Sequence, residues 1–190
     1  MAVGDELVEL VDELDVVVEV VTRAEMRRRG SDARHRAVYV AVVTSANELV
    51  VHQRAPWKDI LPSWWDVCFG GVLGVGEAWD AAAVRELAEE AGVDGRPVLL
   101  GADLWDAPGA AISARVYRVD HDGPFTCPDG EVVAVDRVPL ADVAGWLSAH
   151  DVCPDSVDLV LPRLLPPPPS DEDGGGAQAQ PAAGDPGHGG

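Results

Sequence analysis

Residues 71–93 read GVLGVGEAWDAAAVRELAEEAGV, and this stretch decides the fold of the chain. It opens with three closely spaced glycines, a pattern that is typical of a tight connection between two elements. No proline or glycine interrupts residues 79–91, and Gly92 follows them directly. Because glycine commonly ends helices, the pattern predicts a helix over residues 79–91.

Three glutamates share one side of the predicted helix. At about 100° per residue, Glu86, Glu89 and Glu90 fall within an arc of about 100°. The opposite side is apolar and is expected to pack on a sheet; it consists of Val84, Leu87, Ala88 and Ala91. Clustered carboxylates suit Mg²⁺, which prefers oxygen ligands, so the acidic side is a candidate metal site. A solvated acidic face is the alternative interpretation of the triplet alone.

Nine positions of the quoted stretch match the Nudix box, which is Gly, five residues, Glu, seven residues, then Arg-Glu-aliphatic-x-Glu-Glu-x-Gly-aliphatic. They are Gly71, Glu77, Arg85, Glu86, Leu87, Glu89, Glu90, Gly92 and Val93. At average residue usage, the chance of all nine at one site is roughly below one in a million. The chain therefore resembles the Nudix hydrolase superfamily, over roughly residues 6–165. The resemblance implies an α/β fold, a Nudix-type α/β/α sandwich with a mixed sheet.

The rest of the chain shows strand and helix patterns without a regular βαβ alternation, which agrees with a mixed sheet. Strands are expected over residues 7–14, 16–21, 37–44, 48–53, 65–69, 98–104, 110–119 and 131–135. Helices are expected over residues 140–150 and 155–164, in addition to the helix of the box. A short helix should begin after Thr22, because Thr22 and Glu25 have the spacing of a capping box.

The family resemblance implies roles for particular side chains. Glu86, Glu89 and Glu90 would bind a divalent cation, Mg²⁺ or Mn²⁺, which neutralises a diphosphate and activates a water. We expect Arg85 to belong to the catalytic set and to pair with Glu77, which would fix the glycine-rich loop on the helix. The general base is left open between Glu90 and Glu131, the latter in the late segment Asp129-Gly130-Glu131. The implied reaction is metal-dependent hydrolysis of a diphosphate linkage, in a nucleoside-diphosphate-X or a related organic diphosphate.

The segments RHRAVYVAVV and HQRAPWKDILPSWWDVCFGG resemble the branch that contains isopentenyl-diphosphate isomerase and its hydrolase-like relatives. In this branch His35 lies where the isomerases have a metal-binding histidine. Arg54 and Lys58 are candidate ligands of the substrate phosphates, as are Arg34 and Arg36, because guanidinium groups match phosphate oxygens. Each of these cations has a surface-charge interpretation as its alternative.

The isomerase alternative depends on a cysteine. Aligned on Gly71, the isomerase cysteine would fall at Gly70 and the following histidine at Val72, so Cys68 lies two residues too early. Cys68 is therefore predicted to be a small core residue. Hydrolysis is favoured over an isomerase-like reaction for this reason. A third hypothesis, a non-catalytic ligand sensor on the Nudix fold, is less favoured because no box glutamate is missing.

Composition limits the partners of the chain. With 14 basic and 33 acidic residues the net charge is −19, which disfavours a nucleic acid. No stretch approaches the roughly 18 apolar residues of a membrane span, and the opening MAVGDELVEL lacks a signal pattern. We expect a cytoplasmic protein with reduced thiols and a small-molecule substrate. The group attached to the diphosphate and the oligomeric state, a homodimer included, are left open.

Residues 1–165 are expected to form the Nudix domain, with residues 36–165 as its catalytic core. Residues 166–190 contain Pro, Gly, Ala, Gln and Asp but no large apolar side chain, so they are expected to form a disordered tail. Deleting residues 166–190 should therefore change the free energy of unfolding by less than about 0.5 kcal/mol and leave catalysis intact. Chemical denaturation of the truncated and full chains tests this, and a large loss of stability on truncation would contradict it.

Overall fold

An apolar strand, β3 (His35–Val43), forms the centre of the computed structural model, which describes residues 3–165. From Ala37 to Val43 every side chain is buried, as expected for a strand that is covered on both faces. Strand β8 (Ala110–Asp120) runs parallel to β3 and pairs with it along the whole length of β3. The predicted tail at residues 166–190 lies outside the described residues.

The other edge of β3 is shared by three antiparallel strands. In order along β3 they are β1 (Leu7–Val11), β6 (Phe69–Val72) and β4 (Glu48–Arg54). Around them lie β2 (Val17–Thr22) beside β1, β7 (Val98–Ala107) beside β8, and β9 (Val132–Pro139) with β5 (Trp65–Asp66) beside β4. The nine strands of the described part of the chain form one mixed sheet, which confirms the expected sheet type. The single strand predicted over residues 65–69 is wrong, because β5 and β6 pair with different neighbours.

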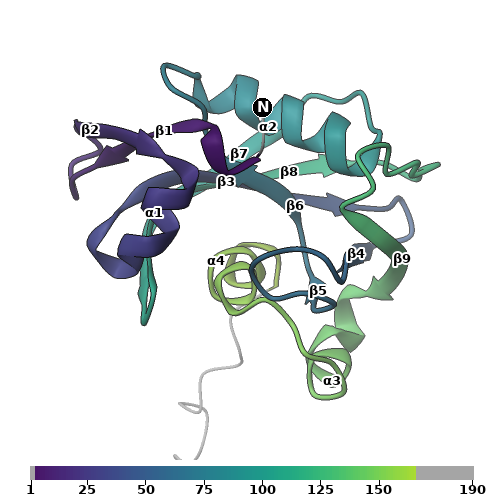
Figure 1. The fold of residues 1–190 in the computed structure, drawn as a ribbon. Coiled ribbons are helices and arrows are strands. Elements are labelled where there is room, and N and C mark those ends of the chain that lie inside the picture. Colours follow the sequence, from purple (N-terminus) through teal and green to yellow (C-terminus); the bar gives the residue numbers. More distant parts are fainter. Residues whose placement is uncertain (1–2, 166–190) are drawn as a thin grey trace, which may run out of the picture.

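Helices cover both faces of the sheet (Figure 1). Val38, Val40 and Val42 of β3 pack in the layer of α2 (Trp79–Glu86) and the turn that follows it. Tyr39 and Ala41, on the other face, pack with α4 (Pro154–Leu164) and α3 (Val143–Leu147). The α/β/α sandwich expected from the sequence is therefore present. None of the helices among the described residues is long and apolar enough to cross a bilayer.

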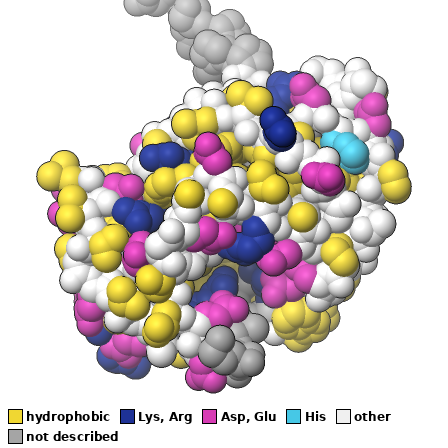
Figure 2. Space-filling view, turned by 90° about the horizontal axis from the view of Figure 1, so that it is seen from above, with side chains coloured by type: hydrophobic (Ala, Val, Ile, Leu, Met, Phe, Trp, Pro, Cys, Tyr) yellow, Lys and Arg dark blue, Asp and Glu magenta, His cyan; other side chains and the backbone are white. Residues whose placement is uncertain are grey.

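The N-terminal hairpin carries a smaller cluster of its own. Helix α1 (Arg23–Arg29) begins at Thr22, whose hydroxyl accepts a hydrogen bond from the Glu25 backbone N–H at 3.2 Å, as predicted. Met26 of α1 packs with Val8, Leu10 and other buried residues of β1 and β2. The opposite face of the hairpin is exposed, and apolar side chains gather at this edge in Figure 2; they include Leu7, Val16, Val18 and Val20. Short 3-10 turns at Val3–Asp5, Gly30–Asp32 and Leu140–Asp142 complete the described elements.

The box helix differs from its prediction in its second half. Helix α2 ends at Glu86 and continues as a π-helical turn, Leu87–Ala91, which Gly92 terminates in the left-handed conformation (φ 68°). Along α2 and this turn the buried residues repeat every four positions, as Ala82-Glu86-Glu90 and Ala83-Leu87-Ala91. Val84 and Ala88, which were expected to pack on the sheet, are exposed instead. Residues four apart share one side of a helix, so Glu86 and Glu90 lie with Ala82 on the side that faces the sheet.

His52, in the middle of β4, is fully buried and stacks on Phe69 with ring centroids 4.6 Å apart. Its Nδ1 has no hydrogen-bond partner among the residues that the structure describes. Burial, with smaller contributions from the Arg54 and Lys58 charges, lowers the pKa of His52 to about 3. The imidazole is therefore neutral in the folded chain at a pH where the unfolded chain takes up a proton.

This burial predicts an acid-sensitive contribution to stability. Between pH 7 and pH 5 the unfolded His52 becomes protonated while the folded one does not, so the free energy of unfolding falls by about 2 kcal/mol from this group. In a His52→Phe variant this component should disappear. Denaturant titrations of both proteins at pH 7 and pH 5 measure it, and identical pH dependence of the two would contradict the assignment.

Candidate active site

Two box glutamates lie against the edge of the sheet rather than in open solvent. Glu90 is 4% exposed, and its Oε2 accepts a hydrogen bond from the Gly70 backbone N–H at 2.9 Å. Glu86 lies over Gly71, where an added Cβ would come within 2.5 Å of Glu86 Oε1. The glycines of β6 therefore allow the carboxylates to approach the backbone closely, and any side chain at Gly71 would displace Glu86.

Burial shifts the pKa of both carboxyl groups. It raises the pKa of Glu86, while the charge and hydrogen bond of Arg85 act in the opposite direction. Burial and the neighbouring Glu86 charge raise the pKa of Glu90 well above its ordinary value. A cation among these groups would favour their charged forms.

Arg85 forms a clamp between the glycine-rich loop and the helix. Its Nε and Nη2 donate to the two carboxylate oxygens of Glu77 at 2.8 and 2.9 Å, the pairing expected from the sequence. Glu77 also accepts a hydrogen bond from the Gly74 N–H at 2.9 Å, so the loop is tied at both ends. Arg85 Nη1 reaches Glu86 at 2.8 Å and Glu89 at 3.0 Å. These contacts give Arg85 a positioning role in this structure.

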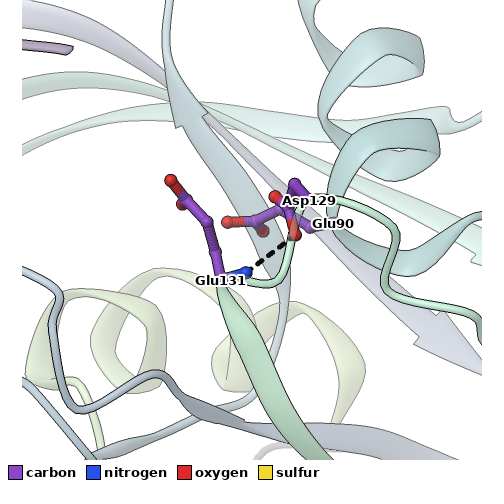
Figure 3. Close-up of side chains that lie close together, drawn as sticks. All are labelled: Glu90, Asp129 and Glu131. Carbon is purple, nitrogen blue, oxygen red and sulfur yellow. Dashed lines mark hydrogen bonds between the residues drawn. The ribbon is translucent and has the colours of Figure 1, made fainter. Parts of the chain in front are cut away.

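The connection between β8 and β9 brings two further carboxylates to Glu90. One carboxylate oxygen from each of Glu90, Asp129 and Glu131 lies within 4.8 Å of the other two, and Figure 3 shows the three side chains close together. Asp129 Oδ1 accepts a hydrogen bond from the Glu131 backbone N–H at 2.9 Å, which fixes the turn that carries both residues. We refer to Glu90, Asp129 and Glu131 as the acidic cluster.

The acidic cluster has the chemistry of a divalent-cation site. Its donors are carboxylate oxygens alone, the type that Mg²⁺ and Mn²⁺ prefer. Of the predicted metal ligands, Glu90 belongs to the cluster and Glu86 precedes it on the same buried stripe. The side chain of Glu89 is 53% exposed and pairs with Arg85 instead. Asp129 was missed from the predicted site, although its spacing of two residues from Glu131 was a visible signal.

The two predicted phosphate ligands lie in different surroundings. Lys58 forms an ion pair with Glu131 of the acidic cluster, and its side chain is 16% exposed. Arg54 turns toward Asp66, with Nη1 3.7 Å from Oδ2, and donates to the Ile60 carbonyl at 3.1 Å. Arg34 and Arg36 pair with other carboxylates, Arg34 with Asp106 and Arg36 with Glu9 and Asp15. Figure 2, which views the molecule from the side of α2, likewise shows acidic and basic side chains intermingled.

Two residues that were associated with the isomerase branch lie away from these contacts. The Nδ1 of His35 lies 3.2 Å from the Ala33 carbonyl oxygen. Cys68 is 3% exposed, packs in the layer of α4, and its thiol donates to Asp66 Oδ1 at 3.5 Å. Burial raises the pKa of the Cys68 thiol well above its ordinary value. Cys68 is thus a core residue, as predicted.

Comparison with known proteins points to one family. The family model described as NUDIX domain matches residues 33–157. The chain is 35% identical over 160 residues to an uncharacterized Nudix hydrolase of Streptomyces coelicolor, covering 83% of this chain and 87% of that one. It is 33% identical over 114 residues to an isopentenyl-diphosphate Delta-isomerase of Nocardia farcinica, covering 60% and 65% of the two chains. A crystal structure of a Deinococcus radiodurans protein has the same fold, with a TM-score of 0.66, 22% identity and coverage of 81% and 96%.

Proposed function

The chain belongs to the Nudix hydrolase family, and we propose that it hydrolyses the diphosphate linkage of a nucleoside-diphosphate-X or related organic diphosphate with Mg²⁺ or Mn²⁺. The observation that carries the proposal is the convergence of Glu90, Asp129 and Glu131 within 4.8 Å. Two segments far apart in sequence supply these carboxylates, which distinguishes them from the side chains of a single acidic helix face.

In this proposal the acidic cluster holds the cation, and Glu86 and Glu89 extend the acidic surface as further candidate ligands. The bound cation supplies neutralisation of the diphosphate charge and a more acidic water. Glu131 is the better candidate for the general base, because its side chain is 26% exposed whereas Glu90 is enclosed against β6. Arg85 would hold the helix and the loop in register, and Lys58 would face the substrate phosphates.

A screen of the purified protein with Mg²⁺ and Mn²⁺ would define the substrate group. The panel comprises nucleoside-diphosphate sugars, dinucleoside diphosphates, nucleoside triphosphates and prenyl diphosphates, with identification of both products. Hydrolysis at the diphosphate is the expected result. Cation binding without turnover of any member of the panel would favour the ligand-sensor hypothesis instead.

Replacing Glu90 by Gln should lower kcat/KM on the order of 100-fold or more, because the change preserves side-chain size but removes a charged ligand. Glu89→Gln should lower activity by a smaller factor, since Glu89 is exposed and lies outside the acidic cluster. Glu13→Gln, at an exposed position of the β1–β2 turn, is the matched control and should retain full activity. Full activity of Glu90→Gln, or turnover undiminished by excess chelator, would rule out the proposed metal site.

The isomerase alternative draws support from the similarity to the Nocardia farcinica isomerase, but the position of Cys68 weighs against it. An acid that donates a proton to an alkene must reach within about 3 Å of it. The Cys68 thiol is buried among the residues that face α4 and is hydrogen-bonded to Asp66, while Glu90 lies in the layer of α2.

We therefore expect Cys68→Ser to retain most hydrolase activity, and the wild-type protein to form no dimethylallyl diphosphate from isopentenyl diphosphate. The assay incubates the protein with isopentenyl diphosphate and Mg²⁺ and analyses the allylic isomer and released phosphate separately. Formation of the isomer by wild type, together with its loss in Cys68→Ser, would make the isomerase reaction the correct one.

A further inference from the structure

The acidic cluster contains a charge imbalance that one side chain partly compensates. Three carboxylates within 4.8 Å of one another repel strongly unless a cation is close. Lys58 supplies this cation through its ion pair with Glu131. Burial raises the pKa of Glu90 and of Asp129, and the nearby Lys58 charge acts against both shifts. Lys58 thus acts electrostatically on the whole cluster.

The backbone holds Lys58 in this position. The Ala55 N–H donates to the Glu131 carbonyl at 2.8 Å, and the Lys58 N–H donates to the Ala55 carbonyl at 3.2 Å. The turn that carries the ammonium group is therefore tied to the strand entry that carries its partner carboxylate. Such an arrangement keeps Lys58 beside the site even when the side-chain contact is broken.

Lys58 is the single lysine of the chain, beside 13 arginines. The two residue types differ in a way that matters here. A guanidinium binds carboxylates through a rigid fork, as Arg85 does with Glu77, and is well suited to a permanent clamp. An ammonium on a flexible stem is a point charge with rotatable donors, so it can exchange one anionic partner for another.

We propose that Lys58 is a displaceable counter-cation, which releases Glu131 when a divalent cation enters the acidic cluster and then contacts the substrate diphosphate. The inference rests on the proposed function and adds a coupling between metal binding and phosphate binding to it. A dication close to Glu131 repels the ammonium and attracts the carboxylate, so the same event makes Glu131 available to the metal and Lys58 available to the phosphates.

The first test is titration of the substrate-free full chain with Mn²⁺ by calorimetry. Lys58→Met should bind Mn²⁺ about ten-fold more tightly than wild type, because no competing cation must leave. Lys58→Arg should bind it more weakly, since the fork is harder to displace. Arg118→Met is the control for loss of a paired cation: Arg118 pairs with Asp120 at the end of β8, outside the acidic cluster, and its removal should leave the affinity unchanged. In activity assays Lys58→Met should raise the KM for substrate, because a phosphate contact is lost. The substitution is thus expected to strengthen Mn²⁺ binding and to weaken substrate binding.

A second measurement observes Lys58 itself in the protein without any substitution, so it does not depend on the folding of a variant. Reductive methylation with ¹³C-formaldehyde labels Lys58 and the α-amino group alone, because the chain has no other lysine. Saturation with Mg²⁺ should shift the Lys58 methyl resonance, and subsequent addition of inorganic pyrophosphate should shift it again.

These outcomes separate the two proposals. Wild-type protein that binds no Mn²⁺ would overturn the metal site itself, and the role of Lys58 with it. Wild-type protein that binds Mn²⁺, with unchanged or weaker binding in Lys58→Met or with an unmoved Lys58 resonance, would overturn the counter-cation role alone. The proposed hydrolase function would stand in that case.

Discussion

The site depends on the constraint that two glutamates must be held on the sheet-facing side of a helix. Burying a carboxylate is costly unless backbone donors or cations compensate it. Here the Gly70 N–H binds Glu90, the Arg85 guanidinium binds Glu86, and the absent side chain of Gly71 leaves room for that carboxylate. Glu86 closes α2 and Glu90 lies in the π-helical turn that follows, and their spacing of four residues places both on one stripe. The helix, the turn and the glycines of β6 are therefore parts of one arrangement.

The two cations beside these carboxylates, Arg85 and Lys58, have different roles because they make different numbers of contacts. Arg85 binds both oxygens of Glu77 and also reaches Glu86 and Glu89, so it joins three segments of the box and cannot move without breaking several contacts. Within residues 3–165, Lys58 makes an ion pair with Glu131 alone. A multiply bonded cation stabilises the scaffold, whereas a singly bonded one can respond to what enters the site.

Much of the fold followed from the sequence because its signals are local. The central strand, the capping of α1 at Thr22 and the helix end at Gly92 each depend on residues adjacent in the chain. The pairing of Glu77 with Arg85 was also predictable, since the box fixes their spacing. The apolar side of the box helix was predicted wrongly at Val84 and Ala88, because all three glutamates were assigned to the solvent side, whereas Glu86 and Glu90 lie on the buried side.

The acidic cluster could be predicted only in part because it joins distant segments. Glu90 came from the box and Glu131 from its late acidic turn, but their proximity depends on how β8 and β9 are placed in the sheet. Asp129 becomes a site residue only through the hydrogen bond that orients the turn. Likewise, the pairing of Lys58 with Glu131 needs the backbone link from Ala55, which no spacing in the sequence reveals.

The layers of the sandwich also separate two kinds of chemistry. Glu90 follows α2 and approaches β6 from that side, whereas Cys68 immediately precedes β6 and packs with Tyr39 toward α4. Because successive residues of a strand point to opposite faces, a shift of one residue would have moved the thiol into the layer of α2. The register of β6 against β3, with Gly70 opposite Tyr39, therefore places the Cys68 thiol in the core that faces α4. The carboxylate of Glu90 lies on the other side of the sheet, in the layer of α2.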